Sequence, residues 1–395
     1  MEFKLSKSQN EIQKAAWDFA RGEFDKNLAL DLDKNSQFPE AIRKKACDLG
    51  FIGIHFDEKY SGGGLGVIEN ALLAETFCRK DSGIGIALML SGYASECLLR
   101  FGKNELGKIF LPKIAEGEMI SAGAFHESDK GFDLSAIETH AVKEKDEWVI
   151  TGSKAYVING RNAGFYIVLC RTDPAGSSDA DLDLSITEGI SMVLVESDRD
   201  GIFFETMGEK LGSRMIETAR LTFDQVRVPK TNIVGKEGNG LAQIRAFFNE
   251  SRLLTAAMSL GIAQGAFDRA IGYVKQREQF GKKIAGFEVT RHKLADMAIK
   301  IELARLITYQ AAWQCDHKKA DEKLSCMAKL YASQAAVEVS DEAMQLLGGY
   351  GYMAEYEVER FYRDAKIIEL FEDQKNTQKN LVADALTGKS GKIGK

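Results

Sequence analysis

Hydrophobic positions follow a helical period at both ends of the chain and a shorter, strand-like period in the middle. In residues 1–118 and 236–395, apolar residues recur every three or four positions, which predicts helices with one buried face. In residues 119–235 they form short runs such as EWVITGSKAYVIN and GFYIVLCRT, separated by Gly, Asn and Asp, which predicts a mostly antiparallel β-domain. The pattern therefore predicts three domains with these boundaries.

Two long helices are predicted in the C-terminal part. One apolar stripe in HKLADMAIKIELARLITYQAAW consists of Leu294, Met297, Ala298, Ile301, Ala304, Thr308 and Ala311. The second helix ends at Gly348 and Gly349, for which we predict a left-handed cap. The acidic segment 173–189 is predicted to be a surface loop, and the basic end TGKSGKIGK to be flexible.

Composition narrows the class of protein. The 395 residues are 45% hydrophobic and 28% charged, with a formal net charge of -6, which argues against a nucleic-acid-binding surface. The six cysteines lie far apart without a CxxC pair, so we interpret them as reduced thiols and predict no metal site. No apolar run is long enough to span a membrane, and we expect a cytoplasmic protein, although a cleaved transit peptide could already be missing.

Three segments carry a resemblance to a known family: KLGSRMIETARLTFDQVRVPKTNIVGKEGNGL (210–241), REQFGKKIAGFE (277–288) and MQLLGGYGYMAEYEVERFYRDAKI (344–367). In this order, and over nearly the whole chain, the sequence resembles the acyl-CoA dehydrogenase family. The resemblance implies an α+β fold with a helical N-terminal domain, a central β-domain and a C-terminal four-helix bundle. It also implies one FAD per subunit and a homotetramer, or a dimer.

The cofactor residues are expected from this resemblance together with their chemistry. A guanidinium such as Arg277 suits bidentate contact with a pyrophosphate, and Gly348 and Gly349 let backbone amides approach a phosphate. In the family these residues hold the adenine-dinucleotide half of FAD, partly across a subunit interface. The full expected set is Phe125, His126, Tyr156, Ile158, Arg277, Phe280, Gln345, Gly348, Gly349 and Gln374.

Glu372 matches the family's catalytic base when the chains are aligned on YRDAKI. In the family this carboxylate removes the α-proton of an acyl thioester while a hydride leaves the β-carbon for flavin N5, which gives a 2-enoyl thioester. Such a base needs a pKa raised by desolvation. Some members carry the base on the first bundle helix instead, just before the arginine, where this chain has Ser251. Glu250 lies one residue away and is therefore an alternative base.

The chain departs from the family's pattern around the expected site. The usual EGT is Glu372-Asp373-Gln374, the threonine of WITN is Ile158, and the DxxR segment begins with Asn249. His126 and Phe132 replace a threonine beside the flavin and a serine that touches the pantetheine arm. His126 is either a structural donor or a residue that tunes the flavin. The expected substrate residues are Phe132, Asn249, Arg252 and Asp373.

Several functions stay open from the sequence. The first is a dehydrogenase of acyl-CoA that passes electrons to an electron-transferring flavoprotein. The second acts on a thioester tethered to an acyl or peptidyl carrier protein, because the pantetheine-side serine and the EGT are both lost. A flavin oxidase or monooxygenase and a silent scaffold on the same fold are further alternatives.

Overall fold

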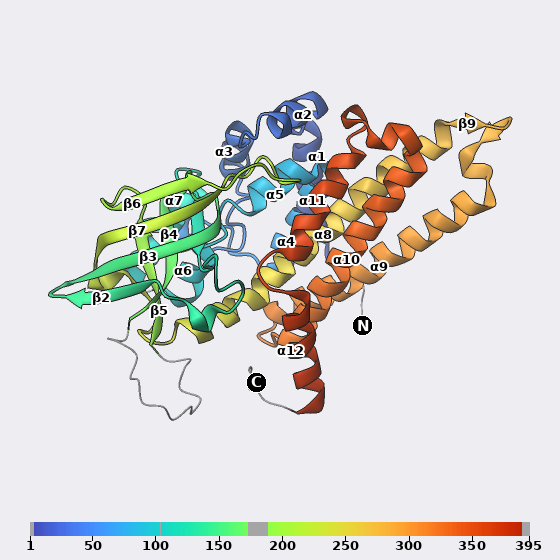
Figure 1. The fold of residues 1–395 in the computed structure, drawn as a ribbon. Coiled ribbons are helices and arrows are strands. Elements are labelled where there is room, and N and C mark those ends of the chain that lie inside the picture. The colour runs from blue at the N-terminus through green and yellow to red at the C-terminus, as the bar shows by residue number, and fades with distance from the viewer. Residues whose placement is uncertain (1–3, 103, 173–188, 389–395) are drawn as a thin grey trace.

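The computed structural model describes residues 4–102, 104–172 and 189–388. Within them the predicted order of a helical, a β and a second helical domain is confirmed (Figure 1). Most of the predicted acidic loop and of the predicted flexible tail lies outside the described residues. The exact domain boundaries stay predictions.

The N-terminal domain is a group of helices that pack on the first bundle helix. Its helices are α1 (Lys7–Glu23), α2 (Lys26–Lys34), α3 (Glu40–Asp48), α4 (Val67–Lys80), α5 (Ser82–Met89), α6 (Ser95–Phe101) and α7 (Asn104–Ala115). Ser6 caps α1 by accepting a hydrogen bond from Gln9 N. The start of α4 contacts the C-terminal domain, because the backbone N–H groups of Val67 and Ile68 donate to the Asp316 carboxylate at 2.6 and 3.1 Å.

The middle domain is one twisted sheet in the described residues, with the order β6-β7-β3-β2-β4-β5-β8 and with β1 paired to β4. The strands are β1 (Ser121–Ala124), β2 (His140–Glu144), β3 (Glu147–Ile158), β4 (Phe165–Arg171), β5 (Ile190–Glu196), β6 (Ile202–Thr206), β7 (Thr218–Pro229) and β8 (Ile233–Val234). Most pairs are antiparallel, as predicted, but β1 runs parallel to β4. The strand-like pattern of residues 119–235 therefore corresponds to a sheet in the structure.

The C-terminal domain is built on long helices that lie side by side in Figure 1. They are α8 (Gly240–Gln276), α9 (Glu288–Asp316), α10 (Glu322–Leu347), α11 (Val358–Leu370) and α12 (Lys375–Thr387), with a small hairpin of β9 (Glu278–Gln279) and β10 (Lys282–Lys283) between α8 and α9. The helix α10 packs against α8, α9, α11 and α12. The predicted stripe of α9 is largely buried, but Ala298 is exposed.

The end of α10 differs in detail from the predicted left-handed cap. The helix does stop at Leu347, and Gly348 has a positive φ of +59°. Its ψ of -137°, however, lies in a region that is essentially open only to glycine rather than in the left-handed helical region. A short 3-10 turn, Gly348–Tyr352, follows directly, and this turn is why the backbone leaves the helix differently.

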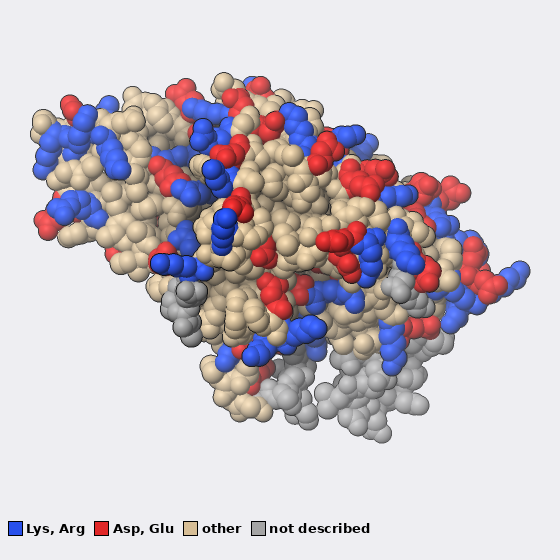
Figure 2. Space-filling view, turned by 180° about the vertical axis from the view of Figure 1, so that it is seen from behind, with Lys and Arg blue, Asp and Glu red and all other residues tan. Residues whose placement is uncertain are grey.

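Two hydrophobic cores support the fold. One runs through both helical domains and includes residues from one face of the sheet, and the other fills the opposite face of the sheet around Trp148 and Phe223. All six cysteines are free, in agreement with the prediction of reduced thiols. Among the described helices, none has the length and apolar character needed to cross a bilayer. Figure 2 shows basic and acidic side chains interspersed over much of one face.

Candidate functional site

Glu372 lies on a strained turn between α11 and α12. The helix α11 ends at Leu370, Phe371 is extended, and Glu372 has a φ of +72°. Asp373 N donates to Phe371 O at 3.0 Å, so Glu372 is the centre of a three-residue γ-turn. A left-handed backbone costs a residue with a Cβ roughly 1–2 kcal/mol. Such strain persists only where the surroundings impose it, and it is concentrated at functional sites.

The Glu372 carboxyl is buried and only partly hydrogen-bonded. Tyr93 Oη donates to its Oε1 at 3.2 Å, while Oε2 has no hydrogen-bond partner among the described residues. Lys329 Nζ, from α10, lies 3.9 Å from Oε2. Burial raises the pKa of Glu372 to about 7, against the opposing effects of Lys329 and Arg252. The arrangement therefore supplies a proton acceptor that is half ionised near neutral pH, with one free oxygen.

The second carboxylate, Asp373, points into the protein rather than to water. Its Oδ2 accepts from Arg252 at 2.9 Å, and its Oδ1 accepts from Gln378 at 2.6 Å and from Lys329 at 3.3 Å. Lys329 also donates to Phe371 O. Three elements, α8, α10 and α12, therefore converge on one side chain beside the turn.

Arg252 and Asn249, two predicted substrate residues, lie one turn apart on α8. Arg252 is buried and donates to Asn249 Oδ1 at 2.9 Å as well as to Asp373. Burial alone would lower the pKa of Arg252, but the Asp373 carboxylate raises it. The guanidinium is thus held inside the protein as a partner of Asp373. The alternative base, Glu250, instead pairs with Arg100 and accepts from Cys315 Sγ at 3.1 Å.

Aromatic side chains cover the other side of Glu372. The Tyr93 ring lies 5.1 Å from that of Phe247 and 5.3 Å from that of Phe371, between centroids. Phe125, a predicted cofactor residue, joins this cluster at 6.0 Å from Phe247. The rings of Tyr93, Phe125 and Phe247 are buried and that of Phe371 is partly buried, so they provide low-dielectric surroundings that raise the pKa of Glu372.

The predicted flavin-side residues of the β-domain meet beside this cluster. Ala155 N donates to His126 O at 2.9 Å, which brings the segment after β1 against the end of β3. His126 packs edge-on against Phe132, with 5.4 Å between ring centroids. Burial lowers the pKa of His126 to about 4, so its imidazole is neutral at pH 7. Ile158 is half-buried, whereas Tyr156 is 66% exposed and has a φ of +56°.

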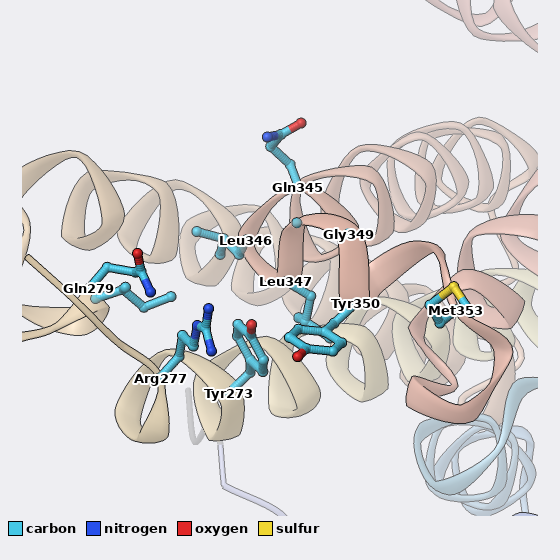
Figure 3. A pocket seen from close by; sticks show the side chains of 11 residues that line it. Tyr273, Arg277, Gln279, Gln345, Leu346, Leu347, Gly349, Tyr350 and Met353 are labelled. Carbon is cyan, nitrogen blue, oxygen red and sulfur yellow. The ribbon is translucent and has the colours of Figure 1, made fainter.

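A separate pocket of about 460 Å³ gathers four more predicted cofactor residues (Figure 3). Its lining includes Arg277, Gln345, Gly348 and Gly349. In Figure 3 the Tyr350 ring lies near Arg277, and the guanidinium carbon is 5.8 Å from the ring centroid.

These residues fit the phosphate and adenine parts of a dinucleotide. The pocket combines a cation, two tyrosine rings, of which that of Tyr350 is exposed, and a glycine turn. A Cβ added at Gly348 or Gly349 would meet nothing within 4 Å. The backbone at this turn is therefore open to close approach by a phosphate.

Two predicted cofactor residues lie apart from both groups. Phe280, at the tip of the β9–β10 hairpin, is 90% exposed and has a φ of +52°. Gln374 is exposed at the N-cap of α12. The Phe280 ring packs edge-on against that of Phe287, with 6.3 Å between centroids.

Sequence reasoning missed Tyr93, Lys329 and Gln378, each of which contacts Glu372 or Asp373. One of them left a signal. Lys329 stands on the small, apolar stripe of α10, near Cys326 and Ala332, where a lysine is unusual without a buried partner. Tyr93 and Gln378 follow no pattern that could have been recognised.

Comparison with known families covers most of the chain. Residues 6–118 match the acyl-CoA dehydrogenase N-terminal domain, residues 122–226 the middle domain, and residues 238–387 the C-terminal domain. The chain is 34% identical to a probable acyl-CoA dehydrogenase of Mycobacterium leprae, over 97% of this chain and 96% of the relative.

Solved structures show the same fold. Butyryl-CoA dehydrogenase from Megasphaera elsdenii is 32% identical with a TM-score of 0.91, and the match covers 98% of this chain and 100% of that one. The prolyl acyl carrier protein oxidase AnaB is 27% identical with a TM-score of 0.90, covering 97% and 100%. With all three domains matched in order, the chain belongs to the acyl-CoA dehydrogenase family of oxidoreductases.

Proposed function

We propose that this chain is an FAD-dependent dehydrogenase that converts an acyl thioester to its 2-enoyl thioester, with Glu372 as the base. The observation that carries the proposal is the state of the Glu372 carboxyl. It is buried, has a pKa raised to about 7 by burial, keeps Oε2 free of hydrogen bonds among the described residues, and stands on a left-handed turn.

The chemistry explains why these features belong together. The α-proton of a thioester is weakly acidic, so a solvated carboxylate is too weak a base to remove it. In the aromatic surroundings of Tyr93 and Phe371 the ionised carboxylate is poorly solvated, and it gains more by accepting a proton. The flavin, when bound, accepts the hydride that leaves the β-carbon.

We assign FAD to the residues of the two groups described above. Arg277, Gly348 and Gly349 would hold the dinucleotide in the pocket of Figure 3. Phe125, His126, Tyr156 and Ile158 would face the flavin ring. His126 Nδ1 lies 3.3 Å from Gly131 O and therefore carries the proton, so the neutral Nε2 would offer an acceptor there without adding a positive charge.

The experiment is an anaerobic titration of the purified flavoprotein with short, medium, branched, cyclic and aromatic acyl-CoAs, following the visible flavin absorbance. One class should bleach the flavin, and Glu372→Gln should slow bleaching by about 10²–10⁴-fold. Glu355→Gln changes an exposed acid without an ion pair in the described structure and serves as the control. Wild-type bleaching by Glu372→Gln would refute the assignment of the base.

A carrier-bound thioester is the second candidate substrate. Phe132 stands where the family has a serine beside the pantetheine arm, and it is 39% exposed. The similarity to a prolyl acyl carrier protein oxidase supports this alternative. Bleaching by acyl or aminoacyl groups on a carrier protein, but by no CoA ester, would establish it.

The electron acceptor is proposed to be an electron-transferring flavoprotein, as the family resemblance implies. An oxidase would instead use dioxygen, so stoichiometric hydrogen peroxide during turnover would favour that alternative. A silent scaffold would bind no FAD and would purify without colour.

We also propose a homotetramer or dimer. Apolar side chains on α9, namely Val289, Ile299, Leu303, Leu306 and Trp313, are 43–61% exposed. Their spacing forms a stripe on the face away from the buried one, which is typical of a helix that packs against a second copy. A monomer in analytical ultracentrifugation would contradict this proposal.

A further inference from the structure

The side chains around Asp373 carry an inference that rests on the proposed role of Glu372 and extends it. We propose that Asp373 is a positioning residue that holds the turn of Glu372 in place and offsets the charge of two buried cations beside it. The residue type at this position departs from the glycine of the family's EGT pattern.

The first step is mechanical. The γ-turn places Glu372 in a conformation that an isolated chain would leave, because its left-handed backbone is strained. Gln378 donates to both the side chain and the backbone carbonyl of Asp373, at 2.6 and 3.3 Å. Lys329 donates to Asp373 and also to the carbonyl of Phe371, so it binds the turn on both sides of Glu372. These contacts hold the strained residue from α10 and α12.

The second step is electrostatic. The charged or titratable groups that face Glu372 are Tyr93 from the loop before α6, Arg252 from α8, Lys329 from α10, and Asp373 itself. Two of them are formal cations, and both are almost fully buried. With Asp373 present, the two cations and the two carboxylates balance when Glu372 is ionised. Without it, Arg252 would keep only the half-buried Glu322 as a paired carboxylate, and the two cations would act more strongly on Glu372 and make it a weaker base.

The third step concerns Arg252. Its guanidinium donates to a neutral amide, Asn249 Oδ1, and to a carboxylate, Asp373 Oδ2, each at 2.9 Å, and its Nη1 lies 3.7 Å from the half-buried Glu322 carboxylate. Position 249 is therefore a second place from which a carboxylate can pair with Arg252. In this chain the carboxylate comes from the turn, as Asp373, rather than from position 249 on α8. The ion pair between Asp373 and Arg252 therefore links α8 to the turn that carries Glu372.

The test compares Asp373→Asn, Asn249→Asp and the double variant in the FAD-loaded enzyme. In Asp373→Asn the acidic limb of kcat/KM should move to lower pH by about one unit, because a like charge beside Glu372 is lost. The plateau of kcat should fall while KM changes little. Adding Asn249→Asp should reverse most of the shift, since the carboxylate returns to Arg252. Asp341→Asn, an exposed change on α10, is the matched control.

A second readout is independent of turnover. The protonation of Glu372 can be followed by infrared difference spectroscopy across pH, with its carboxyl band assigned by Glu372→Gln. The same downward shift is expected in Asp373→Asn. The proposal would be overturned if Asp373→Asn left both the infrared titration of Glu372 and the acidic limb of kcat/KM unchanged, even if this variant were less stable. An active Glu372→Gln would instead refute the function, and the infrared titration would still report on Asp373.

Discussion

Glu127 in the β-domain and Glu372 in the bundle are buried carboxylates that lie 2.9 and 3.9 Å from a buried lysine, and they differ in how many of their oxygens accept hydrogen bonds. In the β-domain, Glu127 accepts from Lys154 Nζ at 2.9 Å and from the backbone N–H groups of Glu138 and Thr139 at 2.8 and 2.9 Å. Burial works to raise its pKa, but Lys154 and these donors lower it to about 2. In the bundle, Glu372 has one hydrogen bond and a pKa raised to about 7.

The difference separates a carboxylate with a structural role from the carboxylate that we propose as the base. An ionised group whose oxygens are all paired gains nothing by taking up a proton, whereas an underpaired buried carboxylate does. Burial and a nearby lysine are common to both pairs, so neither feature alone marks a catalytic residue. The free oxygen and the strained backbone distinguish Glu372.

The largest expected effect on stability comes from breaking the structural pair. Lys154→Met should leave Glu127 as a buried charge without its cation and lower the free energy of unfolding by about 3–5 kcal/mol. Chemical denaturation of the FAD-loaded protein measures it. Lys230→Met removes an exposed pair with Asp146 and should cost at most about 1 kcal/mol. Equal losses in the two variants would contradict the comparison.

The two carboxylates should also give stability opposite dependences on pH. The folded-state pKa of Glu372 lies above its ordinary value of 4.5, so the folded protein binds the extra proton and loses stability as pH rises from 4.5 to 7. Glu372→Gln removes this loss and should be the more stable protein at pH 8, by on the order of 3 kcal/mol.

Glu127→Gln is the matched opposite. The folded-state pKa of Glu127 is lowered, so its stabilisation is present above pH 4.5 and is lost as pH falls toward 2. Glu127→Gln should therefore be less stable than the wild type at neutral pH. Thermal unfolding of the wild type and of both variants from about pH 2 to about pH 8 provides the measurement. If stability changed with pH in the same way in both variants, the environments of Glu127 and Glu372 would not differ as described.

The smallest expected effect comes from removing the one hydrogen bond that Glu372, the proposed base, accepts among the described residues. Tyr93 Oη favours the ionised form of Glu372, so Tyr93→Phe should raise the pKa of Glu372. Losing this hydrogen bond should change the free energy of ionising Glu372 by about 1 kcal/mol. The acidic limb of kcat/KM should move to higher pH by less than about one unit, with little change on the plateau. Tyr352→Phe, at an exposed position, is the control. A limb that stays in place would show that Tyr93 only packs.

The sequence predicted the order of the domains because each has a strong period. Its motifs also gave Glu372, which the structure buries, and four residues that line the pocket around Arg277, and the functional roles of these residues stay predictions. The direction in which Asp373 points was not predictable. It depends on Arg252, Lys329 and Gln378, which lie on three helices whose relative register no local pattern gives. The ψ angle of Gly348 was missed for a similar reason, since a glycine allows several caps and the following turn selects one.

The sharing of Arg252 between positions 249 and 373 has a consequence for how such a site can change over generations. A lineage with a carboxylate at neither position would leave Arg252 and Lys329 to Glu372 and the half-buried Glu322, and one with a carboxylate at both would place extra negative charge beside Glu372. The two positions are thus epistatic: the tolerated residue at one depends on the residue at the other. A substitution judged harmless in one homologue can be damaging in another that differs only at the second position.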